Sequence, residues 1–93
     1  MVMLYQLTVS GRVQGVGYRN YVTQIAKKLD LKGNVRNKSN GQVLIIVQIT
    51  KDQDLKDFVQ AIKVSGHPYM RIDQVEYAPL DYSKDFRDFR PIY

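Results

Sequence analysis

Residues 11–19 of the chain read Gly-Arg-Val-Gln-Gly-Val-Gly-Tyr-Arg. This segment follows a run of alternating apolar and polar residues and leads into a run with helical spacing. Its three glycines tolerate positive φ angles and allow the backbone to approach a ligand closely. The N–H groups at a helix start lack intrahelical partners and attract anions. The segment predicts a strand-to-helix turn that either binds phosphate or is only a tight turn, because its spacing matches neither nucleotide fingerprint.

Periodic apolar residues on both sides of this turn predict its flanking elements. Residues 3–10 alternate as in a half-buried strand, with Met3, Tyr5, Leu7 and Val9 on one face. The following helix carries the core-facing stripe Tyr18, Tyr21, Val22, Ile25, Ala26 and Leu29, and Gly33 fits its exit. Arg19 lies off that stripe, so it either points toward the glycine turn or is a solvated helix residue.

The second half of the chain repeats this alternation of strand and helix patterns. Residues 33–37 and 42–49 read as strands around an Asn40-Gly41 turn, and the second of them is apolar enough to be central. Thr50 or Asp52 caps a helix that Gly66 and Pro68 end. Its core-facing residues are Leu55, Phe58, Val59 and Ile62. Residues 72–78 read as a fourth strand, and the apolar tail to Tyr93 fits a short edge strand.

The order β-α-β-β-α-β predicts an α+β fold, a ferredoxin-like two-layer sandwich. We expect a four-stranded antiparallel sheet, a short fifth edge strand at the tail, and two helices on one face, all in one domain over residues 1–93. In this topology the first and second strands run parallel with the third between them. The glycine turn and Asn37 then meet at one sheet edge, about 10 Å apart. Asn37 is either part of a site there or only a turn residue.

Composition excludes several kinds of chemistry. The chain has no cysteine and one histidine, which rules out a thiolate nucleophile and disfavours a transition-metal site. No apolar run approaches a membrane span, and the start lacks the order of a signal peptide, so a cytoplasmic location is expected. The formal net charge is +5, with the basic residues scattered along the chain. Such a surface is either simply solvated or attracts anionic substrates.

Two segments together resemble the acylphosphatase family. Residues 11–19 fit the pattern G-x-V-Q-G-V-x-[FY]-R, and residues 33–37 fit the later G-x-V-x-N. The resemblance extends over nearly the whole chain, including residues 71–73 and the closing Phe89 and Tyr93. Two positions depart from the family pattern: Asn34 stands where an aromatic residue is usual, and Ile49 where glycine is common.

The resemblance implies hydrolysis of an acyl phosphate to a carboxylate and orthophosphate, without a metal or other cofactor. By the same resemblance Arg19 binds the substrate phosphate and Asn37 positions the attacking water. The implied phosphate cradle consists of main-chain N–H groups of Gln14, Gly15, Val16, Gly17 and Tyr18. An acyl phosphate suits such a site because its carboxylate leaves readily and needs only a phosphate clamp and an aligned water.

The expected partners are a small acyl phosphate as substrate and inorganic phosphate as product or inhibitor. We expect the chain to bind neither nucleic acid nor a membrane and to act as a monomer. An RNA-binding module on the same fold is one rival interpretation. It needs aromatic residues on the open face of its central strands, and residues 42–49 contain none. A regulatory domain that binds an anion without turnover is a second rival, which the sequence leaves open.

Overall fold

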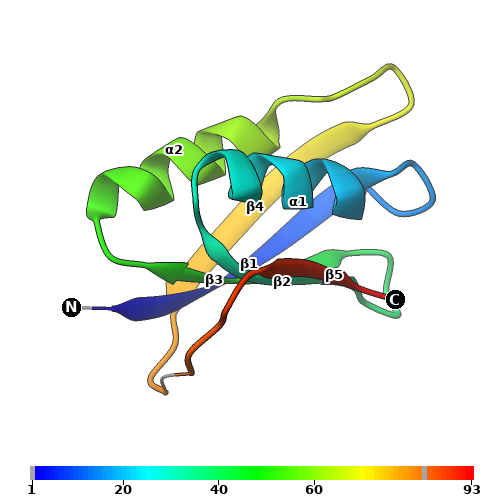
Figure 1. The fold of residues 1–93 in the computed structure, drawn as a ribbon. Helices are drawn as coiled ribbons and strands as arrows, with labels where there is room; N and C mark the ends of the chain where they lie inside the picture. The colour runs from blue at the N-terminus through cyan, green and yellow to red at the C-terminus, as the bar shows by residue number, and fades with distance from the viewer. Residues whose placement is uncertain (1, 83) are drawn as a thin grey trace.

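The computed structural model describes residues 2–82 and 84–93, so positions 1 and 83 lie outside the described residues. The elements form a sheet with both helices on one face (Figure 1). This arrangement confirms the predicted two-layer sandwich. In chain order the elements are β1 (Met3–Arg12), α1 (Tyr18–Lys28), β2 (Lys32–Asn37), β3 (Val43–Ile49), α2 (Asp52–Lys63), β4 (Arg71–Pro79) and β5 (Phe89–Ile92).

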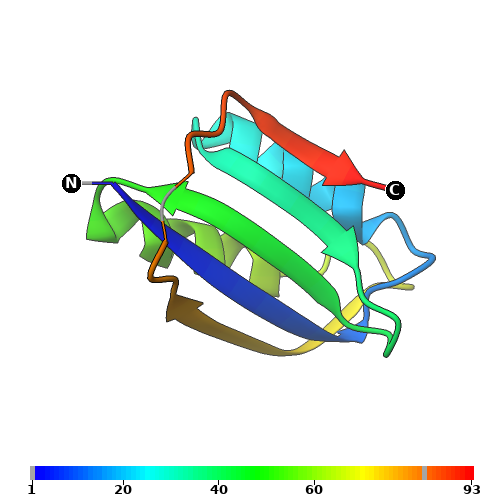
Figure 2. The same ribbon diagram turned by 90° about the horizontal axis from the view of Figure 1, so that it is seen from below.

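The sheet has five strands in the order β4-β1-β3-β2-β5. The four strands predicted to be antiparallel pair in that way, whereas β5 pairs parallel to β2 and makes the sheet mixed. β5 begins at the end of the sheet where β4 finishes (Figure 2), so it runs antiparallel to β4 and therefore parallel to β2. As expected, β3 lies between β1 and β2. The carboxyl ends of β1, β2 and β5 therefore lie at one end of the molecule.

The main core lies between the sheet and the helices. Leu7 and Val9 of β1 are fully buried in it, whereas Met3, predicted on the same face, is 39% exposed at the start of the strand. Leu4 is only 1% exposed although it faces away from the helices. The connection after β4 lies close to this residue, since Leu80 N donates to Leu4 O at 2.8 Å. The open face is thus partly covered, which strand alternation alone does not reveal.

The end of α1 differs from the prediction. Asp30 adopts the left-handed conformation with φ 57°, and Leu31 N donates to Ala26 O at 2.8 Å. With the Asp30 N to Lys27 O bond at 3.1 Å, this is a Schellman ending. Gly33, predicted at the helix exit, lies inside β2 instead. A Cβ atom there would collide with the Ile46 carbonyl oxygen, so glycine permits the close approach of β2 and β3.

Both ends of α2 also differ from the prediction. The N-cap is Lys51, which makes no side-chain cap bond, so neither Thr50 nor Asp52 caps the helix. The helix ends at Lys63, before Gly66, and side chains from α1 reach its last carbonyls. Tyr18 Oη donates to Ile62 O at 2.9 Å, and Tyr21 Oη donates to Val64 O at 2.8 Å. These bonds occupy carbonyls that a helix end leaves without intrahelical partners.

The helices α1 and α2 contain 11 and 12 residues. Within the described part of the chain, no helix is long and apolar enough to cross a membrane.

Candidate active site

The turn between β1 and α1 has the conformation that its glycines predict. Gly15 and Gly17 have φ angles of 72° and 81°, in the region that favours glycine. Gly17 is the N-cap of α1, and the bond from Tyr21 N to Gly17 O at 3.1 Å closes the first helical turn. The N–H groups of Tyr18, Arg19 and Asn20 precede this bond, so they have no intrahelical acceptor.

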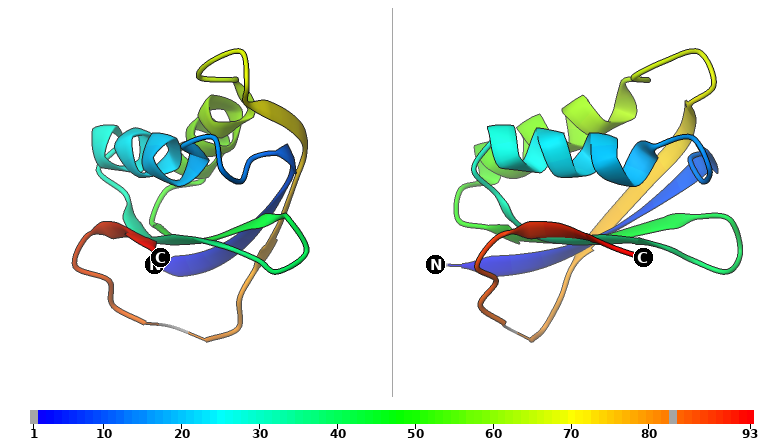
Figure 3. Two further views of the ribbon diagram at one scale, coloured as in Figure 1. Left: turned by 90° about the vertical axis from the view of Figure 1, so that its right-hand side faces the viewer. Right: turned by 45° about the vertical axis from the view of Figure 1, so that its right-hand side comes forward.

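A small hollow of about 90 Å³ lies beside this turn. The turn itself lies at the end of the molecule that faces the viewer in the left panel of Figure 3. Pockets that enclose drug-sized ligands measure roughly 300–1,000 Å³, so the hollow suits a single phosphoryl group and a water. Its lining residues are Val13, Gly15, Gly17, Tyr18, Arg19, Asn20, Asn37 and Tyr93. The fold thus brings together Arg19, Asn37 and three of the predicted cradle residues from distant parts of the sequence.

Two predicted cradle residues, Gln14 and Val16, do not line the hollow. Gln14 Nε2 donates to Lys38 O at 2.7 Å and to Gln42 O at 2.8 Å. These bonds fasten the glycine turn to the connection between β2 and β3. The carbonyl of Val16 lies 2.6 Å from His67 Nε2. Both residues therefore contact the neighbouring loops that hold the turn in place.

The Arg19 guanidinium lies against the end of the chain. One terminal nitrogen donates to Ile92 O at 3.0 Å, and the guanidinium carbon lies 4.3 Å from the centroid of the Tyr93 ring. A cation over an aromatic face is attracted by the ring quadrupole. Tyr93 Oη in turn donates to Asn20 Oδ1 at 2.7 Å. A guanidinium has five N–H donors, so the contact with Ile92 leaves others to grip an anion.

Asn37 lies at the end of β2 and lines the hollow. Its Oδ1 atom is buried and has no hydrogen-bond partner among the described residues. A buried acceptor left without a partner costs about 1–3 kcal/mol. A water that reaches this oxygen could donate a hydrogen bond to it, whereas an unprotonated phosphoryl oxygen could not.

Tyr93, Asn20 and Val13 line the hollow but were not predicted as site residues. Tyr93 is the clearest omission, because it contacts Arg19 directly. It bonds Asn20 across 73 positions of sequence, and no local pattern connects two positions so far apart. The closing aromatic residue of the family pattern was the only available signal.

Tyr18 lines the hollow, and its phenol is held in the neutral form. Burial, reinforced by the nearby Tyr21, raises the pKa of the Tyr18 phenol well above its ordinary value of 10.0. Its hydroxyl donates to Ile62 O at the end of α2, so this proton is already used in a hydrogen bond within the protein. No Asp or Glu side chain is among the described residues that line the hollow. Among residues 2–82 and 84–93, no group of three or more His, Asp or Glu side chains could hold a metal ion.

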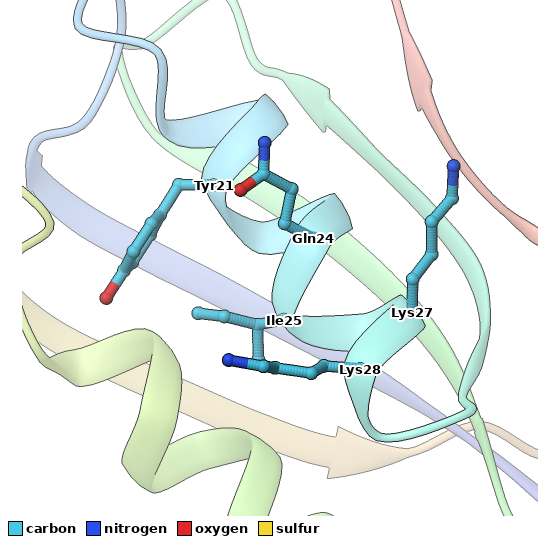
Figure 4. Close-up of a pocket in the computed structure, with 5 residues that line it drawn as sticks. All are labelled: Tyr21, Gln24, Ile25, Lys27 and Lys28. Carbon is cyan, nitrogen blue, oxygen red and sulfur yellow. The ribbon is translucent and has the colours of Figure 1, made fainter.

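A larger hollow of about 470 Å³ lies on the outer surface of α1 (Figure 4). Its side chains fan out from this one helix and include neither Arg19 nor Asn37. They are Tyr21, Gln24, Ile25, Lys27 and Lys28. Because this hollow lacks both the glycine turn and the strand ends, the small hollow is the better candidate for an active site.

Comparisons with known proteins agree in both sequence and structure. The family model described as Acylphosphatase matches residues 5–91. An acylphosphatase of Borrelia garinii subsp. bavariensis is 37% identical over 90 residues, which is 95% of this chain and 96% of the relative. The crystal structure of acylphosphatase from Bacillus subtilis has a TM-score of 0.87 and 32% identity, and the match covers 100% of both chains.

A longer protein contains a similar unit. The crystal structure of full-length HypF in its phosphate- and nucleotide-bound form matches with a TM-score of 0.82 and 28% identity. That match covers 100% of this chain and 12% of the HypF chain.

Proposed function

The chain belongs to the acylphosphatase family and hydrolyses acyl phosphates, and we propose that Arg19 and Asn37 are the residues that carry this reaction. One observation supports the assignment above all. Arg19 at the start of α1 and Asn37 at the end of β2 line one hollow of about 90 Å³ with two glycines of positive φ. Acyl phosphate hydrolysis needs a phosphate clamp beside a held water, and the two side chains are suited to these tasks.

The phosphate clamp combines main-chain and side-chain donors. In this proposal the main-chain N–H groups of the turn, residues 14–18, surround the phosphoryl oxygens. Of these residues, Gly15, Gly17 and Tyr18 line the hollow, and the Arg19 guanidinium supplies the compensating positive charge. Preorganised donors of this kind stabilise negative charge as it develops in the transition state. The stacking of Arg19 on Tyr93 supports its role, because a fixed guanidinium loses less freedom on binding.

Asn37 is proposed to orient the attacking water. A carboxamide offers both an acceptor and two donors, so it can hold a water in line with the scissile bond. It is not a base near neutral pH. The water oxygen forms the new bond to phosphorus while the phosphorus–oxygen bond to the acyl group breaks. The carboxylate leaves with that electron pair, and the proton of the water passes to a phosphate oxygen or to solvent.

The expected domain organisation, oligomeric state, metal independence, partners and location remain predictions, and each can be checked by a direct measurement. Residues 1–93 act as one domain and as a monomer, which sedimentation of the purified protein would check. Turnover needs no metal, so an excess of chelator leaves the rate unchanged. Inorganic phosphate competes with substrate, and single-stranded RNA does not bind. Cell fractionation would check the cytoplasmic location.

Two variants test the division of labour between phosphate binding and water positioning. In Arg19→Ala, inhibition by inorganic phosphate weakens about 10–100-fold, as loss of a charge-assisted hydrogen bond implies, and turnover of benzoyl phosphate falls further. In Asn37→Ala, kcat falls while the phosphate inhibition constant stays within about 2-fold, since its partner is water.

Each variant serves as the control for the other, with thermal unfolding showing that both remain folded. An unchanged phosphate inhibition constant in Arg19→Ala would contradict the clamp. Equal losses of phosphate binding and turnover in Asn37→Ala would assign Asn37 a structural role instead.

A further inference from the structure

His67 is the single histidine of the chain, and it contacts the glycine turn from the connection between α2 and β4. Its Nε2 lies 2.6 Å from Val16 O, and its Nδ1 accepts the Tyr69 N–H at 3.2 Å. A carbonyl oxygen can only accept, so Nε2 carries a proton, and Nδ1 must be bare to accept in turn. The two contacts together select the neutral imidazole with its proton on Nε2.

The connection that carries His67 is itself held in place. Met70 N donates to His67 O at 3.1 Å, and Ser65 Oγ lies 2.6 Å from the carbonyl oxygens of both His67 and Met70. Met70 is only 3% exposed, which anchors the connection in the core. Gly66 lies against the Tyr21 ring so closely that a Cβ atom there would collide with it. These contacts hold the backbone around His67 in place, and this fixes the position of the imidazole against the glycine turn.

The bond to Val16 O determines where the next N–H points. The peptide between Val16 and Gly17 is trans, so its carbonyl and its N–H point in opposite directions. Gly17 lines the hollow, whereas Val16 does not. Because Gly17 is a glycine at φ 81° and tolerates either sign of φ, this peptide could turn over at little steric cost. A reversed peptide would aim a carbonyl oxygen, in place of an N–H, at a bound anion.

We propose that His67 is a positioning residue of the phosphate site. It holds the Val16 carbonyl outward and thereby keeps the Gly17 N–H aimed at the substrate phosphate. This inference rests on the proposed function, because it assigns the Gly17 N–H to the phosphate cradle. A positioning role of His67 can be told apart from a structural role, because loss of His67 should change the affinity for phosphate while the fold stays intact.

The test compares His67→Ala with His67→Gln, whose side-chain N–H can reach a similar position. Tyr69→Ala is the matched control, because it removes a neighbouring ring but keeps the main-chain N–H that His67 accepts. We expect His67→Ala to weaken inhibition by inorganic phosphate about 5–10-fold, as for one lost hydrogen bond. His67→Gln should recover to within about 3-fold of the wild type by supplying that donor again, and Tyr69→Ala should match the wild type.

A second measurement reports the peptide orientation without phosphate. The nuclear Overhauser effect between the Val16 Hα and the Gly17 amide proton depends on the Val16 ψ angle, which a reversed peptide changes. Its intensity should change in His67→Ala and return in His67→Gln, while the thermal unfolding midpoint stays near that of the wild type. An unchanged intensity in His67→Ala would overturn the inference and leave the roles of Arg19 and Asn37 untouched. A changed intensity with unchanged phosphate inhibition would contradict the proposed cradle instead.

Discussion

At the scale of single residues, the Arg19 guanidinium lies over the Tyr93 ring, so the proposed phosphate clamp predicts that this ring contributes to phosphate binding. Tyr93→Ala removes the surface on which the guanidinium stacks and the bond to Asn20. Cation–π contacts at exposed sites contribute about 0.5–1 kcal/mol, so we expect phosphate inhibition to weaken about 2–5-fold. The inhibition constant and kcat/KM for benzoyl phosphate are the quantities to measure.

Tyr93→Phe separates the ring from its hydroxyl. It keeps the stacking surface and loses only the bond to Asn20, so it should lie closer to the wild type than Tyr93→Ala does. A Phe variant as impaired as the Ala variant would show that the hydroxyl, through Asn20, matters more than the ring.

At the scale of elements, Tyr18 joins the start of α1 to the end of α2. Tyr18→Phe removes the hydroxyl that donates to Ile62 O and leaves a carbonyl in a buried place without that partner. We expect the free energy of unfolding to fall by about 1 kcal/mol, measured by urea denaturation at pH 8.

The same residue predicts how stability depends on alkaline pH. Burial raises the pKa of Tyr18 in the folded protein above its ordinary value of 10.0. Above about pH 10 the unfolded chain can release this proton while the folded chain retains it, so the unfolded state binds fewer protons and stability falls as pH rises. Tyr18→Phe should show a shallower loss between pH 9 and pH 11. Parallel curves for the two proteins would contradict the buried, neutral phenol.

Gly33 fixes the close approach of β2 to β3. Gly33→Ala would force a Cβ atom against the Ile46 carbonyl oxygen at a φ of 150°. We expect a loss of more than about 2 kcal/mol in the free energy of unfolding, because the added Cβ atom collides with the carbonyl and the φ angle is unfavourable for alanine. Gly41→Ala is the matched control: its φ is also positive, at 93°, but open space surrounds it. Equal losses in the two variants would attribute the effect to φ alone.

The faces of the elements could be predicted from sequence, whereas their ends could not. The stripe along α1 is a local property of helical spacing, and it correctly placed Tyr18, Val22 and Ala26 in the core. The end of α2 depends on hydroxyl groups 43 and 44 positions away in sequence. No capping signal near Gly66 could reveal that contribution.

At the scale of the whole molecule, the net charge of +5 should assist capture of an anionic substrate. We expect kcat/KM to fall as ionic strength rises from 0.01 to 0.5 M, because the Debye length shortens from about 30 Å to a few ångströms. The kcat value should change much less. A rate constant insensitive to salt would show that the scattered basic residues are only a solvated surface.

Lys51 provides a variant that tests this field without touching the site. It is exposed at the start of α2, and the start of α2 lies at the opposite end of the molecule from the turn between β1 and α1 (Figure 1). Lys51→Gln should lower kcat/KM slightly at low salt and match the wild type at high salt.

The topology of the whole chain also explains how far the site could be predicted. The order β1-β3-β2 follows from the sequence of elements, and it brings Arg19 and Asn37 to one edge as expected. The contribution of Tyr93 could not be derived in that way. It depends on β5 pairing parallel to β2 after a connection that crosses the sheet, and neither the pairing partner nor its direction is encoded in four residues of edge strand.

The parallel course of β5 has a practical consequence for work with the purified protein. Because Tyr93 stacks on the Arg19 guanidinium and lines the hollow, an affinity tag appended after it would emerge at the mouth of the proposed catalytic centre. A tag before Val2 would emerge at the far end of the sheet (Figure 1). Kinetic work should therefore use the amino-terminal fusion, and a carboxyl-terminal one would be expected to impair turnover even in a correctly folded protein.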